Sequence, residues 1–242
     1  MEELLRDCSC GKLQLPDFQR SWVWDEERIK GLLASISQAF PIGALMTLEM
    51  KAGAAETFAR RPIQGALPAA EARVPDALLL DGQQRMTSLY QTCLRDEVVE
   101  TITPRQRLVR RWFYIDIQKA LDPGSDRGEA ICGIPEDRKV KHNFDRDVVL
   151  DLSEPDFEYV HLMFPLHKVF DTFKWMQGFV NYWNRKGDPT KWDLFSAFKE
   201  GVLDNFKSYH VPVIALGHDT SHEAVCLVFE KVNTGGKALD AF

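Results

Sequence analysis

Hydrophobic residues recur at two spacings along the 242-residue chain, and together they predict a mixture of strands and helices. Short unbroken apolar runs are typical of buried strands, and apolar residues three or four positions apart are typical of helices. Strands are expected at residues 12–15, 44–50, 77–80, 111–117, 148–150 and 211–216, and helices at 26–40, 83–94, 165–184, 190–208 and 221–232. The predicted fold class is therefore α/β (α+β), a small mixed sheet with a helical second half packed on it.

Two long stretches show no clear period. Residues 51–76 and 118–147 are rich in Gly, Pro and charged side chains, so both are interpreted as loops. Pro212 places the strand at 211–216 at an edge or end of the sheet, because proline cannot donate to a ladder. We expect a core over residues 1–160 and a helical extension over 161–242.

The centre of the pattern is the junction between the strand at 77–80 and the helix that begins near Gln83. The chain must turn within about one residue, and Gly82 can supply the unusual dihedral angles. The first N–H groups of the helix have no intrahelical acceptor and lie at the positive end of its dipole. The turn therefore predicts an anion site, with Arg85 beside it as a forked donor suited to phosphate.

Asp81 has two possible roles at this turn. It can cap the helix, or it can bind Mg²⁺ and orient an attacking water with help from Gln83 or Gln84. The two roles are compatible. No Gly-x-x-x-x-Gly-Lys-Ser/Thr sequence occurs, so the chain is not a P-loop enzyme.

Three motifs are spread over nearly the whole chain in a fixed order. They are LPDFQRSWVW at 15–24, DGQQR at 81–85 and FEKVNTGGKAL at 229–239. Together they resemble the N-terminal domain of GmrSD-type restriction endonucleases, a domain similar to ParB and sulfiredoxin. The resemblance implies a nucleotide pocket at the DGQQR turn, and so a nucleotide-binding core over residues 1–160.

The resemblance also implies roles for single residues. Catalytic roles fall on Asp81, Gln83, Gln84 and Arg85, and nucleotide contacts fall on Gln19, Arg20, Gly82, Asn233, Thr234 and Gly235. Two purely structural alternatives stay open. Arg20 can instead stack on Trp22 or Trp24, and the glycines after Thr234 can serve only to end the last helix.

The function implied is an NTP-binding and hydrolysing domain of a modification-dependent DNA restriction system in phage defence. It would use Mg²⁺ and an NTP, with GTP, ATP and CTP not distinguished. The alternative is a ParB-like module in which nucleotide switches DNA binding without significant turnover, and a third hypothesis is that the domain itself nicks DNA. The resemblance further implies a His-Asn-His nuclease domain after Phe242 or a separate nuclease subunit, and a homodimer is a further hypothesis.

The charge pattern adds a second region of interest. The net charge of −6 argues against a surface that is basic all over, but Arg105, Arg107, Arg110 and Arg111 lie close together. They form either a solvated charged face or a DNA-phosphate contact. The chain has no apolar run of roughly 18 residues and an acidic start, so we expect a cytoplasmic protein without a membrane partner. Its five cysteines include no Cys-x-x-Cys pair for zinc.

Overall fold

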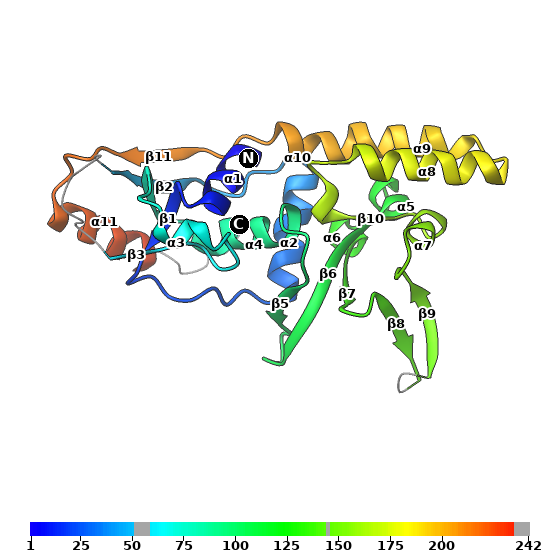
Figure 1. The fold of residues 1–242 in the computed structure, drawn as a ribbon, viewed down its shortest axis with the longest axis horizontal. Helices are drawn as coiled ribbons and strands as arrows, with labels where there is room; N and C mark the ends of the chain where they lie inside the picture. The colour runs from blue at the N-terminus through cyan, green and yellow to red at the C-terminus, as the bar shows by residue number, and fades with distance from the viewer. Residues whose placement is uncertain (51–58, 144–145, 235–242) are drawn as a thin grey trace. The chain divides into compact units, whose positions relative to one another are not determined.

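The computed structural model describes residues 1–50, 59–143 and 146–234 and has mixed α/β content, which confirms the predicted fold class (Figure 1). Its helices are α1 (Glu2–Cys10), α2 (Glu26–Ser37), α3 (Ala69–Ala72), α4 (Gln83–Cys93), α5 (Ile117–Leu121), α6 (Arg127–Ala130), α7 (Pro155–Val160), α8 (Phe173–Lys186), α9 (Thr190–Phe198), α10 (Asp204–Ser208) and α11 (His222–Thr234). Its strands are β1 (Leu13–Pro16), β2 (Leu45–Glu49), β3 (Arg60–Arg61), β4 (Ala77–Asp81), β5 (Val99–Ile102), β6 (Leu108–Asp116), β7 (Ile131–Pro135), β8 (Lys139–His142), β9 (Asp147–Asp151), β10 (Met163–Pro165) and β11 (Val213–Leu216).

The chain divides into two compact units, each assembled from separate segments. We call one the motif unit, residues 3–22, 43–87 and 211–242, and the other the hairpin unit, residues 1–2, 23–42 and 88–210. This grouping does not follow a boundary near residue 160. The assignment of a nucleotide-binding core to residues 1–160 stays a prediction.

The motif unit is built on a five-stranded mixed sheet in the order β11-β2-β4-β1-β3. β4 lies at its centre, parallel to β1 and antiparallel to β2. β11 pairs only with β2 in this order and occupies the sheet edge that Pro212 predicted. Helix α11 packs on the sheet through Val225, which is buried with Leu48, Leu78 and Leu80. The apolar run of β4 is therefore covered, as a continuous hydrophobic strand requires.

The hairpin unit is organised around the long strand β6, which pairs antiparallel with β5, β7 and β10 along its length. β8 and β9 form a separate two-stranded ladder that projects from the rest of the unit (Figure 1). Helices α8 and α9 pack against each other, and their aromatic side chains fill the core. Trp175, Phe179 and Phe195 lie there with ring centroids 5.2 to 5.7 Å apart. All three aromatics are buried, and Phe179 and Phe195 lie on the helix faces whose apolar spacing predicted burial.

Helix α2 begins where its sequence predicted. The carboxylate of Asp25 accepts a hydrogen bond from the backbone N–H of Arg28 at 2.9 Å and caps the helix. Ile29, Leu33 and Ile36 on one face are fully buried. The start of the helix is therefore confirmed, but the helix ends at Ser37 instead of residue 40, and Phe40 is 54% exposed.

The two predicted loops were wrong as loops in the described residues. The stretch 51–76 contains β3 and α3, while its residues 51–58 lie outside the described part of the chain. The stretch 118–147 contains α5, α6, β7 and β8. These elements are short, and β7 exists because β6 offers it a pairing edge, which no local pattern reveals.

The helical second half also starts differently from its prediction. The helix expected at 165–184 begins only at Phe173, because Met163–Pro165 pairs with β6 and residues 166–168 form a 3₁₀ turn. The apolar spacing within 165–184 predicted that Phe173 would be buried, but its side chain is 64% exposed. The helix expected at 190–208 is present as α9 and α10 with a π-helical turn at Lys199–Leu203 between them. No helix in the described ranges combines the length and the apolar character needed to cross a membrane.

Candidate functional site

The turn between β4 and α4 has the geometry that the sequence predicted. β4 ends at Asp81, α4 begins at Gln83, and Gly82 between them has φ of +95°. A Cβ at this position would lie 2.2 Å from Cδ2 of Leu45. Glycine therefore suits both the backbone conformation and the close approach of the buried Leu45 side chain.

Asp81 and Arg85 face each other one helical turn apart. Nη2 of Arg85 donates to Oδ2 of Asp81 at 2.9 Å and to the carbonyl oxygen of Ala44 at 2.9 Å. Their side chains are 35% and 17% exposed, respectively. The guanidinium is thus fixed beside the turn, while the carboxylate stays reachable from solvent.

The two glutamines of the DGQQR motif hold the backbone of the first motif. Nε2 of Gln83 donates to the carbonyl oxygen of Arg20 at 2.7 Å, and Nε2 of Gln84 donates to that of Ser21 at 3.1 Å. Both side chains are buried, at 7% and 8% exposure. The start of α4 and residues 20–21 are therefore joined by direct side-chain contacts.

Gln19 makes the reciprocal connection. Its buried amide Nε2 donates to the carbonyl oxygens of Leu79 and Leu80, at 2.6 and 3.0 Å, near the end of β4. Gln19 was predicted to contact nucleotide, and the structure places it as a tie between the first motif and the central strand. Its predicted contact to nucleotide remains untested.

Arg20 is the exposed member of the first motif. Its side chain is exposed, and its guanidinium makes no ion pair, hydrogen bond or ring contact with another residue in the part of the chain that the structure describes. The stacking alternative on Trp22 is thus not observed. Arg20 is an available cation whose backbone is fixed against the turn.

Arg61 is a residue of this site that sequence reasoning missed. Its Nη2 donates to the carbonyl oxygens of Gln19 and Arg20, both at 3.0 Å. The sequence showed only a small Arg60-Arg61 cluster inside a predicted loop. The contact depends on the pairing of β3 with β1, in which Arg61 lies opposite Leu15.

The third motif reaches the same unit through its first residue. The ring of Phe229 on α11 contacts the ring of Phe18 edge to face, with centroids 4.7 Å apart. Asn233 and Thr234 are the last residues of α11, but their side chains lie outside the described residues, as does Gly235. Their predicted contacts with nucleotide stay predictions.

The four arginines of the predicted DNA contact lie in the hairpin unit and differ in their partners. Arg110 pairs with Glu136 at 2.5 Å, and Arg111 pairs with Glu26 at 3.1 Å. Arg105 and Arg107 lie at the exposed turn between β5 and β6, and no ion pair joins either to another described residue. The cluster thus separates into two arginines that pair with an acid, of which Arg110 is itself exposed, and two that pair with no acid among the described residues.

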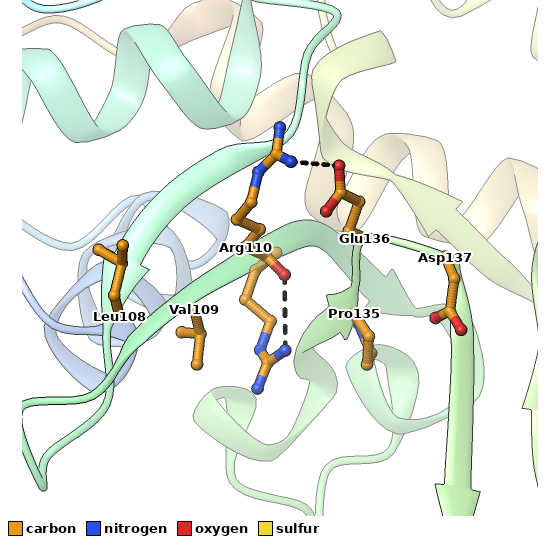
Figure 2. Close-up of a pocket in the computed structure, with 7 residues that line it drawn as sticks. Leu108, Val109, Arg110, Pro135, Glu136 and Asp137 are labelled. Carbon is orange, nitrogen blue, oxygen red and sulfur yellow. Dashed lines mark hydrogen bonds and ion pairs between the residues drawn. The ribbon is translucent and has the colours of Figure 1, made fainter. Parts of the chain in front are cut away.

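A hollow of about 620 Å³ lies over β6 and β7 in the hairpin unit (Figure 2). The apolar part of its wall is Leu108, Val109 and Pro135, and the Arg110–Glu136 ion pair spans it. The hollow does not include any residue of the three motifs. Because Glu136 neutralises Arg110 across the hollow, this arginine offers little attraction to a phosphate.

No group of three or more His, Cys, Asp or Glu side chains that could hold a metal occurs among the described residues. Asp81 remains a single accessible carboxylate beside the turn. A magnesium ion is commonly held by one or two carboxylates together with substrate phosphates. The residues present fit an ion that arrives with a nucleotide better than one held by the protein alone.

The fold and the turn define a mixed α/β protein in which a strand–glycine–helix junction is tied to a distant N-terminal motif. The family model of the GmrSD restriction endonuclease N-terminal domain matches residues 1–242, and the chain belongs to that family. The chain is also 27% identical over 250 residues to the uncharacterized protein MJ0686 of Methanocaldococcus jannaschii. That match covers 99% of this chain and 39% of the relative, so the chain spans well under half of the relative's length.

Proposed function

We propose that the β4–α4 turn binds the phosphates of a nucleoside triphosphate and that this domain hydrolyses it. The observation that carries the proposal is the meeting of the motifs. Gln83 and Gln84 of the second motif hold the backbone of the first motif, and Phe229 of the third contacts Phe18. Family membership supports a role in DNA restriction. We propose that nucleotide turnover acts in that process.

The groups at the turn suit a phosphate chain. The N-terminus of α4 supplies the positive end of a helix dipole, and Arg85 is a fixed guanidinium beside it. Arg20, exposed and held next to the turn, supplies a second guanidinium. The fixed guanidinium of Arg85, together with that of Arg20, would stabilise the negative charge that develops on a transferring phosphoryl group.

Asp81 is the proposed acidic group of the site. It would hold Mg²⁺ together with phosphate oxygens, and the ion would supply charge neutralisation on the phosphates. Since the pairing with Arg85 leaves the carboxylate partly exposed, Asp81 can also orient the attacking water. Gln83 and Gln84 have their amide N–H groups bonded to the carbonyls of residues 20 and 21, so in this proposal they position the site and Asp81 carries the chemistry.

The test is phosphate release from ATP, GTP, CTP and UTP with Mg²⁺, for wild type and Asp81→Asn, with and without DNA. We expect turnover of one nucleotide and its loss by roughly a hundredfold or more in the variant. Asp76→Asn is the matched control, because Asp76 is an exposed acid that precedes the same strand. A folded wild type that neither binds nor hydrolyses any of the nucleotides would overturn the proposal.

A second candidate function is a nucleotide-switched DNA-binding module without turnover. The exposed Arg105 and Arg107 favour this function. They lie at the β5–β6 turn of the hairpin unit, and no acid among the described residues pairs with either. Nucleotide binding without phosphate release, combined with DNA affinity that depends on the nucleotide, would favour this function over hydrolysis. The nuclease activity, a nuclease partner and a homodimer belong to the whole protein and are likewise proposals.

A further inference from the structure

The backbone of residues 19–21 is held in an unusual way. Three successive carbonyl oxygens, those of Gln19, Arg20 and Ser21, all accept hydrogen bonds from side chains. Buried or partly buried carbonyl groups are usually satisfied by secondary structure or by water. Here the donors come from α4 and from β3, so the position of the segment depends on those side chains.

Arg61 is the donor that serves two of the three carbonyls. Its Nη2 lies 3.0 Å from the oxygens of both Gln19 and Arg20, and its Nε lies 3.9 Å from Oδ1 of Asp17. A planar guanidinium with several fixed donors suits such a double contact better than an ammonium group. The side chain is 29% exposed, so solvent competes only partly for these bonds.

The strand that carries Arg61 is coupled directly to the first motif. β3 pairs antiparallel with β1, placing Arg61 opposite Leu15, and the backbone N–H of Asp17 donates to the carbonyl oxygen of Ala59 at 2.8 Å. The guanidinium therefore reaches residues 19–21 from β3, a strand that is held to the first motif by backbone hydrogen bonds. Gln83 approaches the same carbonyl of Arg20 from α4 at 2.7 Å, so this carbonyl is held by side chains from two elements.

We infer that Arg61 is a positioning residue of the nucleotide site, holding the backbone of residues 19–21 so that Arg20 is presented beside the start of α4. The inference rests on the proposed function. Arg61 acts through Arg20, because its Nη2 donates to the backbone of the segment itself, while the guanidinium of Arg20 is exposed. The ligand chemistry is that of a polyphosphate, which a guanidinium binds through paired hydrogen bonds.

The first arm of the test measures amide hydrogen exchange of residues 17–22 in the nucleotide-free full chain. Arg61→Met removes the donors and keeps much of the side-chain length, and we expect exchange to accelerate about tenfold in this segment. Arg61→Lys, which keeps the charge and a donor, should restore part of the protection. Arg60→Met is the matched control, because the neighbouring Arg60 donates instead to the carbonyl oxygen of Arg73 at 2.8 Å.

The second arm measures the affinity for the magnesium complex of the nucleotide selected by wild type, in a double-mutant cycle. Arg20→Ala and Arg61→Met should each weaken binding by about tenfold, the loss typical of a hydrogen bond to a charged group. The double variant should bind no more weakly than Arg20→Ala alone, because Arg61 acts through Arg20. A purely structural defect would instead lower the melting temperature and weaken binding additively.

The outcomes separate the inference from the proposed function. Accelerated exchange together with non-additive binding losses supports the positioning role. Unchanged exchange in Arg61→Met, or additive losses that reach about a hundredfold in the double variant, overturns it. If wild type binds no nucleotide, the proposed function fails, while the exchange arm still decides whether Arg61 fixes the segment.

Discussion

The two units of the molecule bury their polar groups in different ways. In the motif unit, buried amides of Gln19, Gln83 and Gln84 hold main-chain carbonyls of distant segments. In the hairpin unit, the buried carboxylate of Glu158 accepts from Tyr114 at 2.9 Å and from Trp175 at 2.8 Å. The first arrangement fixes a backbone, and the second fixes side chains within an aromatic core.

This difference indicates that the motif unit carries the functional site. Side-chain ties between segments cost more to assemble than an apolar core, since each buried polar group must find its partner. A chain that concentrates such ties around one glycine turn gains a defined geometry there. The hairpin unit gains stability from its aromatic packing, and its exposed arginines lie at a turn outside that core.

The largest expected effect comes from the turn itself. Gly82→Ala combines a positive φ with a Cβ 2.2 Å from Leu45, and we expect a loss of about 3 kcal/mol or more in the free energy of unfolding. Gly187→Ala in the hairpin unit is the control, because Gly187 also has a positive φ but its Cβ would meet no atom within 4 Å. Its cost should be about 1 kcal/mol. Urea unfolding measures both, and equal costs would show that β2 yields easily at the turn.

A smaller effect is expected at the tie between the first motif and β4. Gln19→Leu replaces the buried polar side chain by an apolar one of similar size and leaves the carbonyls of Leu79 and Leu80 without their amide donor. We expect about 2 kcal/mol of destabilisation and faster amide exchange in residues 17–22. Gln118→Leu is the control, since Gln118 is exposed at the start of α5. Stability unchanged from wild type would mean that the tie is dispensable.

A buried histidine should make the stability of the hairpin unit depend on pH. Burial lowers the pKa of His167 from 6.5 to about 4, outweighing the nearby Asp96 carboxylate, which raises it, while Lys168 and Arg138 lower it further. The unfolded chain takes up a proton on this histidine near pH 6.5 and the folded chain does not, so stability falls as the pH falls from about 6.5 to about 4.

The check for this pH effect is urea unfolding of wild type and His167→Asn at pH 7 and pH 5. Wild type should lose on the order of 1 kcal/mol more than the variant between these values. The comparison with the variant also removes the opposite contribution of Glu158, whose pKa is raised by burial and whose share of stability is lost as pH rises. Parallel behaviour of the two proteins would exclude His167 as the source.

The smallest effect concerns DNA. Replacing Arg105 and Arg107 by alanine should weaken DNA binding by a few-fold and reduce the slope of log affinity against log salt by about 1 to 2. Arg110→Ala serves as the comparison, since its guanidinium is already neutralised by Glu136. An equal change of slope in both variants would mean that the exposed turn is not a DNA contact.

The sequence predicted the part of the site that depends on local chemistry. Gly82, the apolar run before it and the helical spacing after it determine the turn, and the structure has that turn at the same residues. The ties could not be predicted, because Gln19 finds its acceptors 60 residues away. Arg61 was hidden for the same reason, since its role depends on the pairing of β3 with β1.

For the arginine cluster, the sequence predicted the region but not which of its arginines are paired with acids. Arg105 and Arg107 resembled Arg110 and Arg111 in the sequence, but ion pairs with Glu136 and Glu26 distinguish them in the fold. Glu26 is 85 residues from Arg111 along the chain. A charge pattern therefore predicted that cations gather in this region, and only tertiary contacts decide which of them are available to a partner.

The most direct test of the central claim is a hydrogen-exchange footprint of the bound nucleotide. The chain is incubated with Mg²⁺ and a slowly hydrolysed triphosphate analogue, and protection is measured across all peptides. We expect protection in residues 17–22 and 82–86 of the motif unit and none at the β5–β6 turn that carries Arg105 and Arg107. Protection confined to the hairpin unit, or binding that leaves both motif segments unchanged, would contradict it.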